Sequence, residues 1–348
     1  MMFIRPVEYK DLPGLMELAR SAASGGVGLT SLPINEDRLQ KRIARSVLSF
    51  SGELDRADHG YVFVLEDSEN GKVAGICAVE AAVGLKEPWY NYRVGTIVHA
   101  SEELGVYSRH ETLFLSNDHT GYSELCTLYL HPDYRVKRNG GLLSKSRFLF
   151  LAQFPQLFGK MVVAEMRGVS DESGCSPFWE ALGRHFFSID FAEADYLTGI
   201  GQKAFVAELM PKHPVYVDFL PPEAQAVIGL THEATRPAVA MLESEGFRYE
   251  GYVDIFDAGP TVQAYTSDIR AVKDSQRLPA RVVDPLPDGD KECYLVCNDA
   301  LQDYRVVLVE SVRPQGEFCL TPELAQALKI KDGDHVRCVT LTPKEAVQ

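Results

Sequence analysis

The chain has 348 residues, of which 45% are hydrophobic and 24% are charged. This is the composition of an ordinary soluble globular protein with room for more than one domain. The net charge of −14 argues against nucleic acid as a partner, because phosphate binding needs a basic surface. No apolar run is long enough to span a membrane, and the N-terminal MMFIRPVEYKDL becomes charged at once, so we expect a cytoplasmic protein without membrane contact.

The chain starts with a predicted strand followed by two predicted helices. Phe3–Pro6 is the strand, and Asp11 is placed to cap a helix that has Pro13 near its start. A loop over Ser24–Gly28 separates it from a second helix that begins near Asn35.

A hairpin follows these helices. Tyr61–Asp67 and Lys72–Val79 are rich in β-branched and apolar residues, and Ser68–Gly71 between them ends in Asn-Gly. Asn-Gly between two such runs predicts a tight antiparallel turn.

The segment Ser123–Phe150 predicts a strand, a basic turn and a helix. Apolar residues occupy both faces of the strand up to Leu130, as expected for a central strand, and His131-Pro132-Asp133 ends it. From Asn139 onward apolar residues fall at helical spacing, with Ser144, Lys145 and Arg147 on a predicted polar face. A glycine-containing helix N-terminus beside basic side chains is suited to a phosphate group, although an ordinary basic turn would have the same pattern.

This order resembles the GCN5-related N-acetyltransferase fold, in which such a turn binds the pyrophosphate of acetyl-CoA. The loop Arg135–Gly140 matches the family pattern at its first and last positions, but Arg138 stands where the family usually has glycine. The resemblance implies a mixed α/β (α+β) sheet flanked by helices, elaborated or in tandem.

Longer phrases resemble the arginine N-succinyltransferase family, which includes paired subunits that succinylate arginine and ornithine. They are Gly28–Pro33, Trp89–Gly95, Leu113–Gly121, Ser176–Phe187, Ala207–Lys212 and Tyr252–Pro260. The resemblance covers nearly the whole chain. It implies transfer of a succinyl group from succinyl-CoA to the α-amino group of L-arginine, the first step of an arginine degradation route.

The resemblance also implies roles for two residues. His232 matches the proton donor of the family, and Leu125 matches a succinyl-CoA contact. Without the family, His232 would be read as a cap of the following helix and Leu125 as a core residue. The residues expected to bind the acyl-CoA are Leu125, Leu128, Arg135, Arg138, Asn139, Gly140 and Gly141.

The remaining site candidates follow from the chemistry of thioester aminolysis. Glu124 and Glu165 lie on the two strands expected to diverge around the thioester, where a carboxylate can accept the amine proton. Arg93 suits a succinyl carboxylate, and Asp118 or Asp254 suits a guanidinium. Asn91 lies in the same polar phrase as Arg93 and is expected to bind substrate.

Succinyl-CoA is expected as a co-substrate, with no permanently bound cofactor and no metal. The seven cysteines are scattered and have no metal-ligand spacing, so reduced structural thiols are expected. We expect a homo-oligomer or a hetero-oligomer with a paralogous subunit. Two alternatives stay open: an N-acyltransferase for ornithine or another amine, and a subunit that is inactive without its paralogue.

The predicted organisation is a catalytic region over residues 1–276, a linker over 277–291 and a small β-rich subdomain over 292–348. A weak echo between Val162–Phe187 and Phe205–Phe247 suggests, as an alternative, that the catalytic region has two related halves, 1–200 and 201–276. The linker prediction rests on three prolines and alternating charges in Arg277–Lys291.

Overall fold

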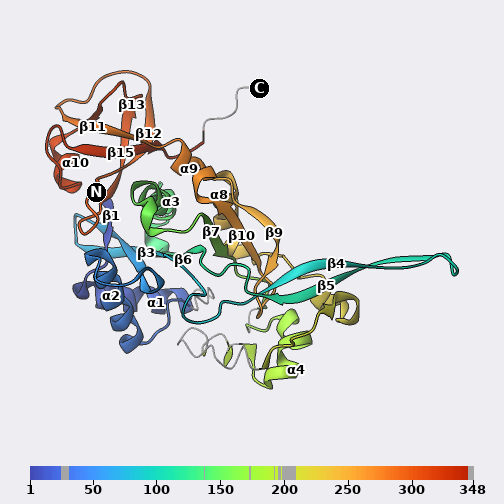
Figure 1. The fold of residues 1–348 in the computed structure, drawn as a ribbon. Coiled ribbons are helices and arrows are strands. Elements are labelled where there is room, and N and C mark those ends of the chain that lie inside the picture. The colour runs from blue at the N-terminus through green and yellow to red at the C-terminus, as the bar shows by residue number, and fades with distance from the viewer. Residues whose placement is uncertain are drawn as a thin grey trace.

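The computed structural model is built around one mixed 15-stranded sheet with helices on both faces (Figure 1). It describes residues 1–24, 31–136, 138–171, 174–191, 193–194, 197 and 209–343. The strand order is β14-β11-β15-β12-β13-β1-β2-β3-β6-β7-β10-β9-β4-β5-β8. The fold is therefore α/β with a mixed sheet, as predicted.

The first part of the chain confirms the predicted order of elements. The elements are β1 (Met2–Pro6), α1 (Leu12–Ser24), α2 (Glu36–Ser51), β2 (Gly60–Asp67) and β3 (Lys72–Glu80). The Asn35 side chain caps α2 by accepting a hydrogen bond from the Arg38 N–H at 3.1 Å. Strands β2 and β3 pair antiparallel, as the Asn-Gly turn predicts.

Asp11 has a different role from the predicted helix cap. A short 3₁₀ turn over Tyr9–Asp11 precedes α1, and the buried Asp11 carboxylate accepts two hydrogen bonds from Arg5, at 2.6 and 2.7 Å. It also accepts the backbone N–H of Glu8 at 2.8 Å. A buried guanidinium binds a carboxylate more strongly than a helix terminus does, and this ion pair joins β1 to the start of α1.

The predicted strand, turn and helix of the central segment are β6 (Ser123–Leu130), a 3₁₀ turn over Pro132–Tyr134 and α3 (Asn139–Gln153). The predicted polar face of α3 is wrong, because Ser144, Lys145 and Arg147 are all buried. Helix α3 lies on the opposite sheet face from α1 and α2, and residues 276–340 cover its outer side. The core therefore surrounds α3 on all sides.

The other half of the sheet contains a long hairpin that the sequence did not reveal. It consists of β4 (Asn91–Ser101) and β5 (Val106–Ser116), and its tip projects far from the body (Figure 1). Most of its outer residues are exposed on both faces, so the apolar alternation that marks a half-buried strand is missing. Strands β7 (Met161–Glu165), β10 (Pro260–Tyr265) and β9 (Arg248–Val253) connect it to β6, and β8 (Val215–Tyr216) flanks β5.

Short helices surround this half of the sheet. They are a π-turn over Trp179–Gly183 that continues into α4 (Arg184–Phe187), then α7 (Pro222–Gln225), α8 (Arg236–Ser244) and α9 (Arg270–Lys273). Some predicted segments lie outside the described residues. They are the loop after Ser24 as far as Gly28, the phrase Gly28–Thr30, Lys137, and residues 205–208, which include Ala207 and Glu208.

The C-terminal residues extend the same sheet. Its elements are β11 (Gln276–Val282), β12 (Lys291–Cys297), β13 (Val306–Val312), β14 (Phe318–Leu320), α10 (Pro322–Ala327) and β15 (His335–Thr340). Residues 277–282 of the predicted linker belong to β11, because they pair with β15 and β14 despite their prolines and charges. β13 pairs with β1 and so joins this part to the catalytic region; the domain limits themselves stay a prediction.

Among the described residues, no helix has the length and apolar character needed to cross a membrane. In the same residues, no cluster of three or more His, Cys, Asp or Glu side chains is arranged to hold a metal ion.

Candidate active site

The candidate site lies where the two parallel strands of the central sheet part. β6 and β7 pair only through Ser123 with Val162 and Glu124 with Val163. Beyond them β6 carries a bulge: Thr127 has φ +51°, and the register to β3 shifts beside it. A positive φ is costly for a β-branched residue and is retained only where the surroundings impose it. The divergence opens the sheet beside Leu125 and Leu128.

The N-terminus of α3 lies at the end of β6, as predicted. The Asn139 side chain donates to the Tyr134 carbonyl at 3.0 Å and so fixes the turn before the helix. A side chain at Gly141 would come within 3.1 Å of Leu341, whereas the space beside Gly140 is open. The backbone at Gly140 can therefore be approached closely by a ligand, and the first-turn N–H groups of α3 lack intrahelical acceptors.

The two arginines of the predicted loop make contacts within the chain. Arg135 donates to the Leu130 carbonyl at 3.1 Å and lies 5.7 Å from the centre of the Tyr129 ring. Arg138 forms an ion pair with Glu310 of β13, and its pKa is raised by the Cys293 thiol first and by Glu310 second. Their roles as phosphate ligands stay predictions.

Glu124 and Glu165 lie on one face of the sheet. Glu124 is opposite Val163, and Glu165 is two residues after Val163, so both side chains are on the face away from α3. The Asn91 amide donates to Glu165 at 2.9 Å and to Thr261 at 3.2 Å. Asn91 is thus a buried link between β4 and the end of β7.

This network includes His119, which sequence reasoning did not assign to the site. Its Nδ1 lies 2.7 Å from the side-chain Oδ1 of Asn91, and its Nε2 lies 3.0 Å from the side-chain Oε1 of Gln263. Burial lowers the pKa of the His119 imidazole, which favours the neutral ring. The only available signal was its place in the polar phrase Asn117–Gly121.

Arg93 and Asp118, predicted to bind different substrate groups, lie together. The Arg93 guanidinium is 3.8 Å from the Asp118 carboxylate, which also accepts the Tyr252 hydroxyl at 2.7 Å. The Tyr252 hydrogen bond is the main cause of the lowered pKa of Asp118, whereas burial and Asp118 raise the pKa of Tyr252 to about 12. Asp118 is therefore ionised at neutral pH and half-exposed, so it is suited to bind a cation.

Asp254 helps to shape a turn. One oxygen of its carboxylate accepts the backbone N–H groups of Phe256 and Asp257, at 2.7 and 3.0 Å. The buried Asp257 then accepts those of Gly168 and Gly259, at 2.7 and 2.8 Å. Burial, with a smaller contribution from Asp254, raises the pKa of Asp257 well above its usual range. Guanidinium binding by Asp254 stays a prediction.

His232 lies beside the end of β7. Its backbone N–H donates to the Arg167 carbonyl at 2.9 Å, two residues after Glu165. Its Nδ1 accepts the Ala234 N–H at 3.2 Å and caps the 3₁₀ turn that leads into α8. Since a backbone N–H can only donate, the neutral imidazole carries its hydrogen on Nε2, which is left to act as a donor.

The same contacts predict how His232 titrates. The pKa of His232 is lowered below the usual 6.5, mainly by burial and second by the positive charge of Arg167. The negative charge of Glu233 opposes this shift. A pKa lowered in the folded state means that the cap stabilises the protein above pH 6.5 and is lost as the pH falls through the folded-state pKa. We expect an NMR titration to place His232 below 6.5, and Arg167→Gln to move it upward. An unchanged midpoint in the variant would show that Arg167 does not act on the ring.

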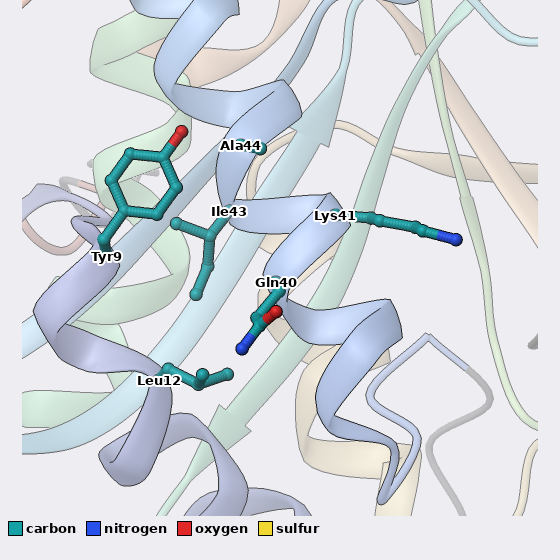
Figure 2. A pocket seen from close by; sticks show the side chains of 6 residues that line it. All are labelled: Tyr9, Leu12, Gln40, Lys41, Ile43 and Ala44. Atoms are coloured by element: carbon teal, nitrogen blue, oxygen red, sulfur yellow. The ribbon is translucent and has the colours of Figure 1, made fainter.

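A separate hollow of about 410 Å³ lies between the start of α1 and the outer side of α2 (Figure 2). Tyr9, Leu12, Gln40, Lys41, Ile43 and Ala44 line it. None of the predicted site residues does, so the hollow is not part of the candidate active site.

The chain contains a strand, two helices, a hairpin and a bulged central strand that parts from its parallel neighbour above a helix N-terminus. This is the order of elements that the resemblance to the GCN5-related N-acetyltransferase fold implied. The comparison with known proteins identifies the family. The sequence model described as "Arginine N-succinyltransferase beta subunit" matches residues 2–271, and that of its C-terminal domain matches residues 276–340. The chain belongs to the arginine N-succinyltransferase family.

Individual relatives match over the full length. The arginine N-succinyltransferase of Yersinia pseudotuberculosis serotype O:3 is 57% identical, and that of Salmonella paratyphi B is 56% identical, each over 99% of both chains. The structure of arginine/ornithine succinyltransferase subunit AI from Pseudomonas aeruginosa superposes with a TM-score of 0.89 at 37% identity, over 99% of both chains.

Proposed function

We propose that the protein transfers a succinyl group from succinyl-CoA to the α-amino group of L-arginine. The observation that carries the proposal is the opening between β6 and β7, which has Glu124 and Glu165 on one face and the His232 segment at its end. Full-length identity of 57% to a protein named arginine N-succinyltransferase supports the substrates.

The thioester lies in this opening, with its pantetheine arm beside Leu125 and Leu128 and its pyrophosphate at the Asn139–Gly141 turn. The loss of β6–β7 pairing after Glu124 leaves backbone groups of both strands available to the arm. The phosphates meet the positive end of α3. Arg135 and Arg138 supply further positive charge.

The reaction is direct aminolysis. The neutral α-amine attacks the thioester carbonyl, the C–S bond breaks, and the sulfur leaves as a thiolate that takes up a proton. Glu124 or Glu165 accepts the amine proton, and Asn91 holds Glu165 in place. The Nε2–H of His232 donates to the thiolate. Positioning of both substrates in one complex supplies much of the acceleration, and no covalent enzyme intermediate is needed.

Asp118 and Asp254 are the candidate partners for the arginine guanidinium. Both carboxylates already have partners within the chain: Asp118 has Tyr252 and Arg93, and Asp254 has two backbone N–H groups. Asp118 is the stronger of the two, because its side chain is half-exposed and so open to a ligand. Seven free thiols, several of them buried, are compatible with the reducing cytoplasm as the place of action.

The test is CoA release by the purified protein with a panel of acyl donors and amine acceptors. We expect the highest kcat/KM with succinyl-CoA and L-arginine. Ornithine is the second candidate acceptor, because the Pseudomonas aeruginosa structure that this chain resembles is named an arginine/ornithine succinyltransferase. A higher kcat/KM with another donor or amine would reject the proposal. Turnover only after addition of a paralogous chain would show a hetero-oligomeric enzyme.

A further inference from the structure

Arg42 reaches the bulge of β6 from the helix α2 that covers it. Its guanidinium donates to the Thr127 hydroxyl at 2.6 Å, to the Cys126 sulfur at 3.8 Å and to the Ser31 carbonyl. Because Glu124 and Cys126 are two residues apart on β6, Arg42 lies on the same sheet face as the Glu124 and Glu165 side chains. Arg42 therefore approaches the position at which β6 leaves β7.

These three acceptors of Arg42 are all uncharged. By contrast, Arg45, one turn later on α2, forms an ion pair with Glu80, and Arg5 is paired with Asp11 and Glu66. Arg42 as a residue is partly buried. A partly desolvated guanidinium without a paired anion gains from binding a carboxylate, because both charges are then compensated.

A second cation lies on the opposite side of the same strand position. Arg147 of α3 is buried, and its guanidinium donates to the Cys126 carbonyl at 3.4 Å and to the Ser144 carbonyl and hydroxyl, each at 3.0 Å. These acceptors are also uncharged. Two guanidinium groups thus flank Cys126–Thr127, and each adds positive potential where the acyl group is placed.

From this arrangement we propose that Arg42 binds the distal carboxylate of a dicarboxylic acyl group and so selects succinyl-CoA over acyl-CoA donors that end in a methyl group. The proposal rests on the proposed function, which places the thioester at this bulge. Two methylene groups separate the thioester carbonyl of a succinyl group from its carboxylate. A receptor therefore has to lie close to the bulge, as Arg42 does.

Arg93, the candidate predicted from sequence for this carboxylate, is less suited. Its guanidinium lies near Asp118 and above the Tyr252 ring, and its side chain is 59% exposed. An exposed arginine next to a carboxylate gains less from a second anion, because water and Asp118 already stabilise its charge.

The test compares succinyl-CoA with butyryl-CoA, which has the same number of acyl carbons and no carboxylate. In Arg42→Gln we expect kcat/KM for succinyl-CoA to fall by roughly 10- to 100-fold, the range for loss of a charged hydrogen bond. The activity with butyryl-CoA should change little, so the preference for succinyl-CoA disappears. Arg42→Lys should keep part of the preference, because it keeps the charge.

Lys41→Gln is the matched control. It removes the same charge from the neighbouring position, but Lys41 is exposed on the outer side of α2 (Figure 2). We expect the preference of this variant to equal that of the wild type. The assignment would be overturned if Arg42→Gln kept the wild-type preference for succinyl-CoA over butyryl-CoA. It would also be overturned if Arg93→Gln lost this preference while Arg42→Gln kept it. Equal falls in kcat/KM of Arg42→Gln with succinyl-CoA and with butyryl-CoA would also overturn the assignment.

A failure of the proposed function can be recognised separately. If the wild type transfers no succinyl group to arginine, calorimetry without an acceptor still compares the binding of succinyl-CoA and butyryl-CoA. Tighter binding of succinyl-CoA that Arg42→Gln abolishes would support the carboxylate site. No preference in the wild type, or the same preference in the variant, would reject it.

Discussion

Replacement of His232 by alanine is expected to lower kcat with succinyl-CoA and L-arginine by about 100- to 10,000-fold, the usual contribution of a positioned acid or base. The physical reason is that the Nδ1 contact with Ala234 leaves Nε2–H as the donor for the departing thiolate. KM should change much less, because the interaction forms as the C–S bond breaks. Steady-state kinetics of CoA release measure both constants.

The cap formed by His232 requires its own control, because alanine removes the cap as well as the proton donor. Asparagine is a good capping residue and can still accept the Ala234 N–H. His232→Asn should therefore keep the melting temperature of the wild type and lose activity to the same extent as His232→Ala. If His232→Asn were as active as the wild type, His232 would be a cap and not a catalytic residue.

The second large effect concerns a buried ion cluster around Glu245. Its carboxylate is fully buried and accepts from Lys145 at 2.8 Å, from Arg270 and from the Ala271 N–H at 2.8 Å. We expect Glu245→Gln to lower the free energy of unfolding by about 3–5 kcal/mol, because it leaves the buried Lys145 and the partly buried Arg270 without their anion. Denaturant unfolding measures the change.

Glu243→Gln is the matched control for this variant. Glu243 is exposed near the end of α8, two residues before Glu245, so its replacement should change the stability by no more than about 0.5 kcal/mol. Equal stabilities of the two variants would show that the cluster contributes nothing net.

The cluster has a further consequence for the C-terminal residues. Lys145 also donates to the Leu341 carbonyl at 2.9 Å, and Arg270 donates to the Thr340 carbonyl at 2.6 Å. Lys145 and Arg270 thus connect the buried cluster to the end of β15 by hydrogen bonds. We therefore expect the loss of stability in Glu245→Gln to be shared by both parts of the chain, so that differential scanning calorimetry shows a single unfolding transition; two separate transitions would show that the cluster does not couple them.

Sequence reasoning succeeded where the signal is local. The hairpin of β2 and β3 follows from an Asn-Gly turn between two apolar runs, and the β6, turn and α3 segment follows from adjacent patterns of different period. Asn139 and Gly140 were predicted at the start of the helix for the same reason, whereas Leu125 was assigned by the family resemblance. The family resemblance then added His232, whose own neighbours indicate only a cap.

Contacts between distant segments are what the sequence could not show. Asn91 and Glu165 are 74 positions apart, and Asn91 further links Glu165 to His119, which was missed. Arg93 was assigned to an anion on its own chemistry, but a carboxylate 25 positions later in the chain, Asp118, lies 3.8 Å from it. The polar side of α3 was expected in solvent because helical spacing cannot show that residues 276–340 cover it.

The amino-acid sequence by itself determined the first strand, the two helices and the hairpin of residues 2–80, the strand, turn and helix of residues 123–153, and the family. These depend on residue types within a few positions of one another. Only the tertiary structure decided which charged groups neutralise each other and which are left for a ligand. Arg5, Arg45 and Arg42 all lie on β1 or α2, yet the first two meet carboxylates, whereas the hydrogen-bond acceptors of Arg42 among the described residues are uncharged. The physical reason is that the charge state and binding capacity of a side chain depend on what the fold brings within a few ångströms of it.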